Sequence, residues 1–329
     1  MRILVTGASG FVGGVTADLL SAAGHQVTAL VRDATARTRL SRVIEVVQAD
    51  LLEPRQLAAA GVSRGFDGVC HLAALTRVRE SRETPLRYFA ANVTGTTNLL
   101  AALDAGTRAT GVAPRFVFGS SCAVYGDTGT SPIPETRAPA PMNPYGASKL
   151  AAEQAVAYQA ATGRLGAVVL RSFNVAGAVG SHADRDSSRI IPAALGVATG
   201  RRDAFRVNGD GASIREYVHV VDMARAYLTA LRATVPGRCT VYNVGSGLGV
   251  SVTDVLRTVE SVTGRDVPRV TLPPVPEPRA LIADSRRIRA DLGWTSPSST
   301  IEKIVADAWR STAVPEPVAA RRGDVPIVS

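Results

Sequence analysis

Tyr145 and Lys149 stand four residues apart, a spacing that could form a proton-transfer site. They open a stretch over 144–162 whose pattern predicts a helix, where residues i and i+4 share one face. The hydroxyl and the ammonium can therefore point into one cleft. A tyrosine has a pKa of about 10 and is a poor base at neutral pH, but a nearby ammonium stabilises its phenolate. The pair favours acid–base catalysis over the alternative, a surface Tyr and Lys on an amphipathic helix.

A group of small polar residues follows the predicted strand 115–118. Ser120, Ser121 and Cys122 come where that strand ends, and ligands of parallel α/β sheets bind at the carboxyl edge. Ser121 could hydrogen-bond a reacting oxygen and relay its proton. Cys122 is interpreted as a small buried thiol and not a nucleophile, because no histidine stands near it in sequence to activate it.

The elements that must position these residues alternate regularly. Predicted strands are Arg2–Val5, Val27–Val31, Ile44–Val47, Gly68–Leu72, Arg115–Phe118 and Ala167–Leu170, with helices at Val12–Ala23, Pro85–Asp104 and Pro144–Thr162. This rhythm predicts an α/β fold, a Rossmann-type doubly wound parallel sheet, and the irregular remainder predicts a smaller C-terminal substrate-binding lobe. The expected division is 1–174 with 213–245 returning to it, then 175–212 with 246–313, and a loose tail at 314–329.

The turn after the first strand has the spacing of a dinucleotide site. Gly7, Gly10 and Gly13 would keep the turn tight and let the backbone approach a pyrophosphate at the helix N-terminus. Ser9, Phe11 and Val12 lie within the same turn. The position of these glycines between a strand and a helix predicts a bound nicotinamide dinucleotide, whose positive ring would further stabilise a Tyr145 phenolate.

The residues at the ends of the second and third predicted strands help to indicate whether NAD or NADP binds. The second strand ends at Val31 without a carboxylate and Arg32 follows, a pattern that could pair with the 2′-phosphate of NADP. Alternatively, Arg32 stacks on the adenine of NAD. Asp50 and Leu51, after the third strand, are expected at the adenine edge.

Charge and composition argue against several classes of protein. The net charge is +9, but 37 basic residues include only two lysines, and the arginines form no block longer than a pair. Nucleic-acid binding is therefore not expected, whereas an anionic small substrate fits. Three scattered cysteines predict neither a disulfide framework nor a metal site. No apolar run suits a membrane span and no signal peptide is expected, so we predict a cytoplasmic location.

Several ordered motifs between Met1 and Trp309 resemble the extended short-chain dehydrogenase/reductases, specifically the UDP-galactose 4-epimerase-like branch. These are Thr6–Gly13, Cys70–Ala74, Asn92–Thr96, Ser120–Gly126, Tyr145–Lys149, Leu170–Gly177 and Arg215–Val220. The resemblance implies that Ser121, Tyr145 and Lys149 are catalytic.

The resemblance also implies binding residues. The residues that would contact the cofactor are Leu72, Ala73, Ala74, Asn92, Ser120, Tyr145, Lys149 and Phe173. Those that would contact the substrate are Thr76, Ser121, Cys122, Tyr145, Asn174 and Arg215. Arg215 would grip a diphosphate. The chain departs from the family pattern at Val31, at Leu281, where an aromatic often stands, and near Arg279, which could replace a missing arginine.

Three functions remain open at this point. The leading hypothesis is a nucleotide-sugar 4-epimerase that works through a transient 4-keto intermediate with bound NAD. An NADPH-dependent 4-ketoreductase of a nucleotide-activated deoxysugar is the alternative, and a non-catalytic dinucleotide-binding regulator is a distant third. Cys122-Ala123 lacks the acid pair of sugar 4,6-dehydratases, which argues against that activity. The Asn92–Ala102 and Ala147–Ala161 stretches could pair across a homodimer.

Overall fold

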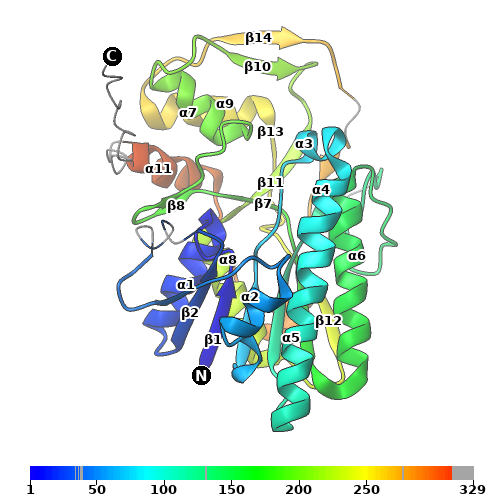
Figure 1. The fold of residues 1–329 in the computed structure, drawn as a ribbon. Helices are drawn as coiled ribbons and strands as arrows, with labels where there is room; N and C mark the ends of the chain where they lie inside the picture. The colour runs from blue at the N-terminus through cyan, green and yellow to red at the C-terminus, as the bar shows by residue number, and fades with distance from the viewer. Residues whose placement is uncertain (34, 36, 38–39, 130–131, 276–277, 313–329) are drawn as a thin grey trace, which may run out of the picture.

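A seven-stranded parallel sheet lies in the lower part of the molecule (Figure 1). The computed structural model describes residues 1–33, 35, 37, 40–129, 132–275 and 278–312, so the tail expected at 314–329 lies outside the described residues. The strands are β1 (Arg2–Thr6), β2 (Gln26–Val31), β3 (Glu45–Gln48), β4 (Gly68–His71), β5 (Arg115–Ser121), β6 (Gly166–Ser172) and β12 (Cys239–Val244). Their order is β12-β6-β5-β4-β1-β2-β3, which confirms the predicted doubly wound α/β fold.

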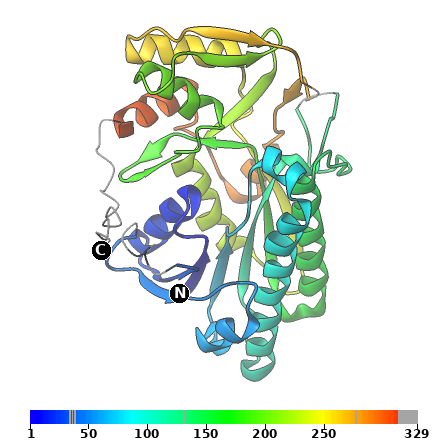
Figure 2. The same cartoon turned by 45° about the horizontal axis from the view of Figure 1, so that its top comes forward.

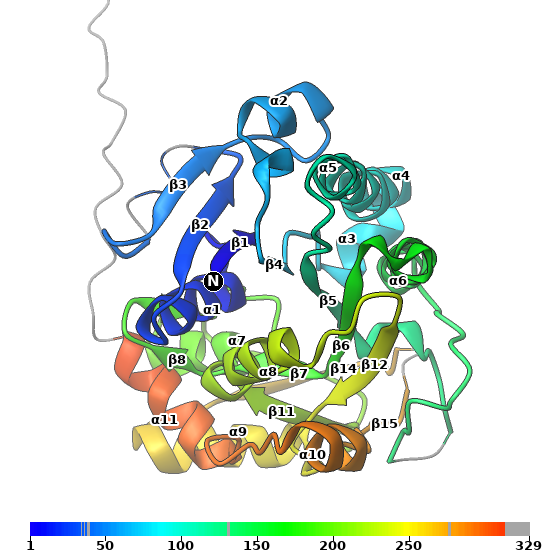
Figure 3. The same cartoon turned by 90° about the horizontal axis from the view of Figure 1, so that it is seen from below.

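Alternate residues of each strand supply the two cores on either side of the sheet. Ile3 and Val5 of β1 join one buried cluster and Leu4 joins the other, as the period of two requires. Helices α1 (Phe11–Ala22), α8 (Val220–Ala233) and α10 (Arg286–Leu292) cover the first face, and α2 (Pro54–Ala59), α5 (Gly95–Thr110) and α6 (Pro144–Gln159) cover the second. Figure 3 shows α5 and α6 on the side of the sheet opposite α1 and α8.

A smaller lobe lies above the carboxyl ends of the strands (Figures 1 and 2). Its strands are β7 (Asn174–Ala176), β8 (Ala178–Val179), β9 (His182–Ala183), β10 (Phe205–Asn208), β11 (Ile214–His219), β13 (Gly249–Ser251), β14 (Arg269–Leu272) and β15 (Ala280–Leu281). Its helices α7 (Ile190–Ala198), α9 (Val252–Thr263) and α11 (Ile301–Thr312) share a core of their own.

The structure differs from the expected elements most clearly at β12 and at the predicted helix 85–104. The last strand of the main sheet, β12, was not predicted; it pairs with β6 across a long stretch of chain. The predicted helix 85–104 is two helices, α4 (Pro85–Phe89) and α5, joined by a π-helical turn at Ala90–Thr94. A short helix α3 (Val78–Glu83) precedes them.

The division into two units stays a prediction. Within 213–245, α8 and β12 pack with the main sheet, whereas β11 pairs with β7, β13 and β15 outside it. Among the described residues, we find no helix that combines the length and the apolar character needed to cross a membrane.

Candidate active site

The first turn of α6 brings Tyr145 to the end of β5. Asn143 caps the helix by accepting a 2.8 Å hydrogen bond from the Gly146 amide, and Pro144 occupies the first turn. A Cβ at Gly146 would lie 2.4 Å from the Ala123 carbonyl oxygen, so the helix can approach the segment after β5 this closely only with glycine there. As a result, the Tyr145 side chain is buried and its hydroxyl lies near Ser121.

Burial governs the protonation of both members of the predicted pair. Burial raises the pKa of Tyr145, and the nearby Ser121 hydroxyl partly opposes that rise. Burial lowers the pKa of Lys149 to about 7, and the Glu153 carboxylate opposes that fall. The Lys149 ammonium lies 4.2 Å from the centroid of the Phe118 ring. In the protein alone, burial therefore favours the protonated Tyr145 hydroxyl, in contrast to the stabilised phenolate that the sequence led us to expect.

The glycine turn after β1 has the shape of a phosphate-binding turn. Gly7 has a φ of +72°, and a Cβ there would lie 2.6 Å from the Ala73 amide nitrogen. A Cβ at Gly13 would lie 2.1 Å from the Gly7 carbonyl oxygen, so both positions require glycine. A Cβ at Gly10 would meet only that same oxygen, at 3.2 Å, and no side chain caps the helix that begins there. The open side of Gly10 and the uncapped amides of α1 fit a pyrophosphate.

The other predicted cofactor residues lie along the carboxyl ends of the strands. Leu72, Ala73 and Ala74 follow β4 and pack beside the glycine turn, and Ser9, Phe11 and Val12 belong to that turn or to α1. At the end of β2, Val31 is buried and Arg32 is exposed. Leu51 accepts a 2.9 Å hydrogen bond from Asn98 of α5, and Asp50 accepts one from the Leu52 amide. Parallel strand ends therefore bring these residues to one edge, while their roles stay predictions.

A buried hydrogen-bonded chain connects β1, β4 and α5 beside this edge. The Thr96 hydroxyl donates to the Asn92 carbonyl at 2.6 Å, so it must accept from Nε2 of His71, 2.9 Å away. Nδ1 of His71 then accepts from the Thr6 hydroxyl at 2.6 Å. Burial, followed by the nearby Lys149 charge, lowers the pKa of His71 to about 3. This histidine is thus a neutral structural link, and no role was assigned to it from the sequence.

Asn92 extends the chain to α6. Its side-chain amide donates to Ser148 Oγ at 2.9 Å and to the Leu75 carbonyl at 3.0 Å, while its oxygen accepts from the Leu75 amide at 2.8 Å. Ser148 in turn donates to the Tyr145 carbonyl at 2.8 Å. Asn92 therefore fixes both the segment after β4 and the turn that carries Tyr145.

Three predicted substrate residues lie together at the lobe. Asn174 of β7 donates to the Glu216 carbonyl at 2.9 Å, and Arg215 precedes Glu216 on β11. The Arg279 carbonyl accepts a 2.9 Å hydrogen bond from the Ile214 amide, which places Arg279 beside the same strand. Asn174 and Arg279 are exposed, and Arg215 is half-buried. Another predicted substrate residue, Thr76, is exposed on the segment after β4.

Cys122 and Phe173 contribute to an apolar cluster near Ser121. Phe173, predicted to touch cofactor, is 3% exposed and packs with Val124 and Tyr125, and Cys122 packs against the same cluster. Burial, with a contribution from Glu216, raises the pKa of Cys122 to about 12. Cys122 is therefore a thiol at neutral pH and a poor nucleophile.

Two buried carboxylates of the site were missed. Glu153 lies one turn after Lys149 on α6 and pairs with Arg171 of β6 at 2.6 Å. Glu216 accepts from the Gly247 amide at 2.7 Å and from the Ala283 amide at 2.9 Å, which ties β11 to two loops. The signal for Glu153 was present: it is a charged residue on the Lys149 face of an alanine-rich helix.

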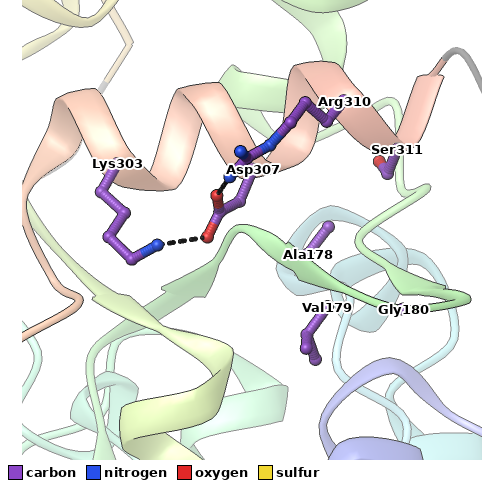
Figure 4. Close-up of a pocket in the computed structure, with 7 residues that line it drawn as sticks. All are labelled: Ala178, Val179, Gly180, Lys303, Asp307, Arg310 and Ser311. Carbon is purple, nitrogen blue, oxygen red and sulfur yellow. Dashed lines mark hydrogen bonds and ion pairs between the residues drawn. The ribbon is translucent and has the colours of Figure 1, made fainter.

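A hollow between α11 and β8 lies apart from these residues. Figure 4 shows Lys303, Asp307 and Arg310 of α11 above Val179 and Gly180. Asp307 accepts from Lys303 at 3.0 Å, pairs with Arg310, and lies 3.0 Å from Nε2 of His219. The charges of this hollow are paired with one another, and no predicted site residue lines it.

Comparison with known proteins places this arrangement in a family. The model of the NAD dependent epimerase/dehydratase family matches residues 3–245. The chain belongs to the NAD dependent epimerase/dehydratase family. The match confirms the resemblance inferred from the motifs, and the glycine turn and Tyr145 site both lie within the matched residues of this epimerase/dehydratase.

The similarity extends over nearly the whole chain. A UDP-glucose 4-epimerase of Corynebacterium glutamicum is 37% identical over 326 residues, which cover 95% of this chain and 96% of the relative. One of Streptomyces lividans is 40% identical over 321 residues, covering 94% and 95%. Among solved structures, a UDP-glucose 4-epimerase from Stenotrophomonas maltophila with bound NAD and formylated UDP-arabinopyranose superimposes with a TM-score of 0.86 at 33% identity, covering 94% and 97%.

Proposed function

We propose that this epimerase/dehydratase is a nucleotide-sugar 4-epimerase that inverts C4 of a UDP-linked hexose of the glucose/galactose type. The observation that carries the proposal is the buried Tyr145 hydroxyl, near Ser121 and one helical turn from Lys149, at the strand ends beside the glycine turn. The full-length similarity to UDP-glucose 4-epimerases supports the substrate class.

The cofactor that best fits the turn is NAD. Gly7 and Gly13 leave no room for a Cβ, Gly10 is open on one side, and α1 begins without a side-chain cap. Gly7, Gly10 and Gly13 would hold the pyrophosphate, with Lys149 and Asn92 toward the nicotinamide side. The solved relative that holds NAD supports NAD over NADP. When bound, NAD would supply a reversible hydride acceptor for C4 of the sugar.

The chain's own residues manage the proton. Tyr145 as phenolate takes the proton of the 4-hydroxyl, with Ser121 bridging the two oxygens. Lys149 as ammonium stabilises the phenolate, which burial alone disfavours. Arg215 and Asn174 hold the diphosphate while the 4-keto sugar turns over, so that the opposite face meets the returning hydride. Tyr145 then gives the proton back to the 4-oxygen, and neither electrons nor protons are consumed in the cycle.

The direct test needs no added cofactor. Freshly purified protein is incubated with UDP-galactose and, separately, with UDP-glucose, and the sugars are separated by chromatography. Interconversion in both directions supports the epimerase. The denatured protein should also release close to one NAD⁺ per chain, identified by mass. Protein that releases NADP(H) or nothing, and turns over only with added NADPH, would instead support the 4-ketoreductase.

We further propose that the chain is a homodimer in the cytoplasm. Exposed apolar side chains on α4 and α6 support an interface there: Leu86 is 82% exposed, Phe89 38% and Tyr158 78%. Light scattering after size exclusion tests the dimer, and Leu86→Asp with Tyr158→Asp should give monomers. Cell fractionation tests the location.

A further inference from the structure

The buried charges behind Lys149 form a connected group that the proposed chemistry does not use. Glu153 is 5% exposed and Arg171 is 6% exposed. Arg171 donates to both carboxylate oxygens, at 2.6 Å from its terminal nitrogen and 3.0 Å from Nε, and Ser120 Oγ donates to the same carboxylate. Every oxygen of Glu153 is thus held in one orientation.

The network continues away from Glu153 through neutral partners. Arg171 uses its other terminal nitrogen to donate to the Tyr125 hydroxyl at 3.0 Å, and Tyr125 donates to Asn243 of β12 at 2.7 Å. Several buried titratable groups on the surrounding elements are uncharged near neutral pH because burial disfavours their charged forms: His71, Tyr88, Tyr125, Tyr145, Tyr227 and Cys239. The charged residues that α3, α4 and α5 bring to α6, such as Glu80, Arg87 and Asp104, form ion pairs that are partly exposed. Glu153 and Arg171 are therefore the buried charges beside Lys149.

A contribution to folding stability does not by itself explain the buried ion pair of Glu153 and Arg171. A buried ion pair gains little over a well-packed apolar pair, because desolvation of the two charges cancels most of their attraction. Glu153 stands one helical turn after Lys149, so the two side chains leave the same face of α6. Lys149 is itself 3% exposed, and a buried ammonium loses its proton unless an anion is near.

We propose that Glu153 is a positioning residue of the active site, whose buried carboxylate, fixed by Arg171 and Ser120, keeps the Lys149 ammonium charged. The role rests on the proposed function only in that the ammonium there stabilises the Tyr145 phenolate. Burial lowers the pKa of Lys149 to about 7 even with the carboxylate present. A further fall of about one unit would reduce the charged fraction at pH 7 from about half to about a tenth.

The lysine content of the chain allows a direct measurement. Lys149 and Lys303 are the only lysines, so protein labelled with ¹³C at lysine Cε gives two resonances. Lys303→Arg assigns them, and Lys303, with a side chain 46% exposed, is the internal control. The Cε shift is followed against pH in the protein as purified.

Glu153→Gln should lower the titration midpoint of Lys149 by about one unit and leave Lys303 unchanged. Glu153→Asp, which keeps the charge, should restore most of the difference. Tyr125→Phe is the matched control, because it removes a hydrogen bond of the same network but no charge, and it should leave the Lys149 midpoint in place. In turnover, the alkaline limb of the kcat profile should move to lower pH with Glu153→Gln only.

An unchanged Lys149 midpoint in folded Glu153→Gln protein would overturn the proposal, as would an equal fall in Tyr125→Phe. If the single variant does not fold because Arg171 is left unpaired, the double variant Glu153→Gln/Arg171→Gln is compared with Arg171→Gln alone. The Lys149 midpoint must then be lower in the double variant, and an equal midpoint in the two would overturn the proposal. The resonance titration needs no substrate. A protein without epimerase activity would therefore refute the proposed function and leave this result standing.

Discussion

Gly13→Ala should weaken cofactor binding by displacing the turn that holds the pyrophosphate. The new Cβ would lie 2.1 Å from the Gly7 carbonyl oxygen and 2.7 Å from its carbon. Both are backbone atoms, so the turn must move by more than about 1 Å to restore van der Waals contact. Overpacking of this kind costs about 1–3 kcal/mol, enough to lower NAD affinity by about 10- to 100-fold. Calorimetric titration of the cofactor-stripped protein measures the affinity, and thermal unfolding measures the stability.

Alanine substitutions at two other glycines distinguish a loss of NAD affinity from a loss of folding stability. Gly196→Ala in α7 makes the same change in a helix, but its Cβ meets only the Arg202 side chain at 3.6 Å, so this variant should gain up to about 1 kcal/mol. Gly10→Ala meets only one atom, at 3.2 Å, so it should lose affinity while its apo stability stays within about 1 kcal/mol of wild type. Wild-type NAD affinity in Gly13→Ala would refute the assignment of this turn.

The other predictions concern the proton, the diphosphate and pH. Tyr145→Phe should lower kcat at least about 100-fold while its NAD content and Tm stay near wild type; a kcat within a few-fold of wild type contradicts its role. Arg215→Met should raise KM about 10- to 100-fold, whereas Arg257→Met, at an exposed position on α9, should not, and steady-state kinetics distinguish the two. Burial raises the pKa of Glu216 from 4.5 to about 7, so its contribution to stability is present below pH 4.5 and lost as pH rises through 7, by about 3 kcal/mol. Denaturant unfolding from pH 4 to 8 should show this loss, and a Glu216→Gln curve as steep as wild type would contradict it.

The sequence predicted the sheet well where pairing follows chain order. Six of the strands were found because apolar runs alternate with helical patterns at short spacing. β12 was not found, since the run Cys239–Val244 resembles any short strand and its partner β6 lies far back in the chain. The break in the predicted helix 85–104 contains Asn92, whose side chain bonds Leu75 and Ser148, and these contacts between distant segments are not visible in the helical pattern.

Some residues of the candidate site could be predicted from their spacing in the sequence, and others are recognised only in the fold. The structure brings Tyr145 to Ser121 and places Lys149 one turn along, as spacing on a helix predicted. Glu153 was overlooked because a glutamate on a helix usually faces solvent, and only the fold shows that Arg171 reaches it from β6. The high pKa of Tyr145 also follows from burial, which spacing does not reveal.

The central claim is that hydride leaves C4 and returns to the same carbon. We would incubate the purified protein with UDP-galactose carrying deuterium at C4, in unlabelled water and without added cofactor, and analyse the UDP-glucose formed. The account predicts full retention of deuterium at C4 in the product. Loss of the label to solvent, or no product until NADPH is supplied, would contradict it.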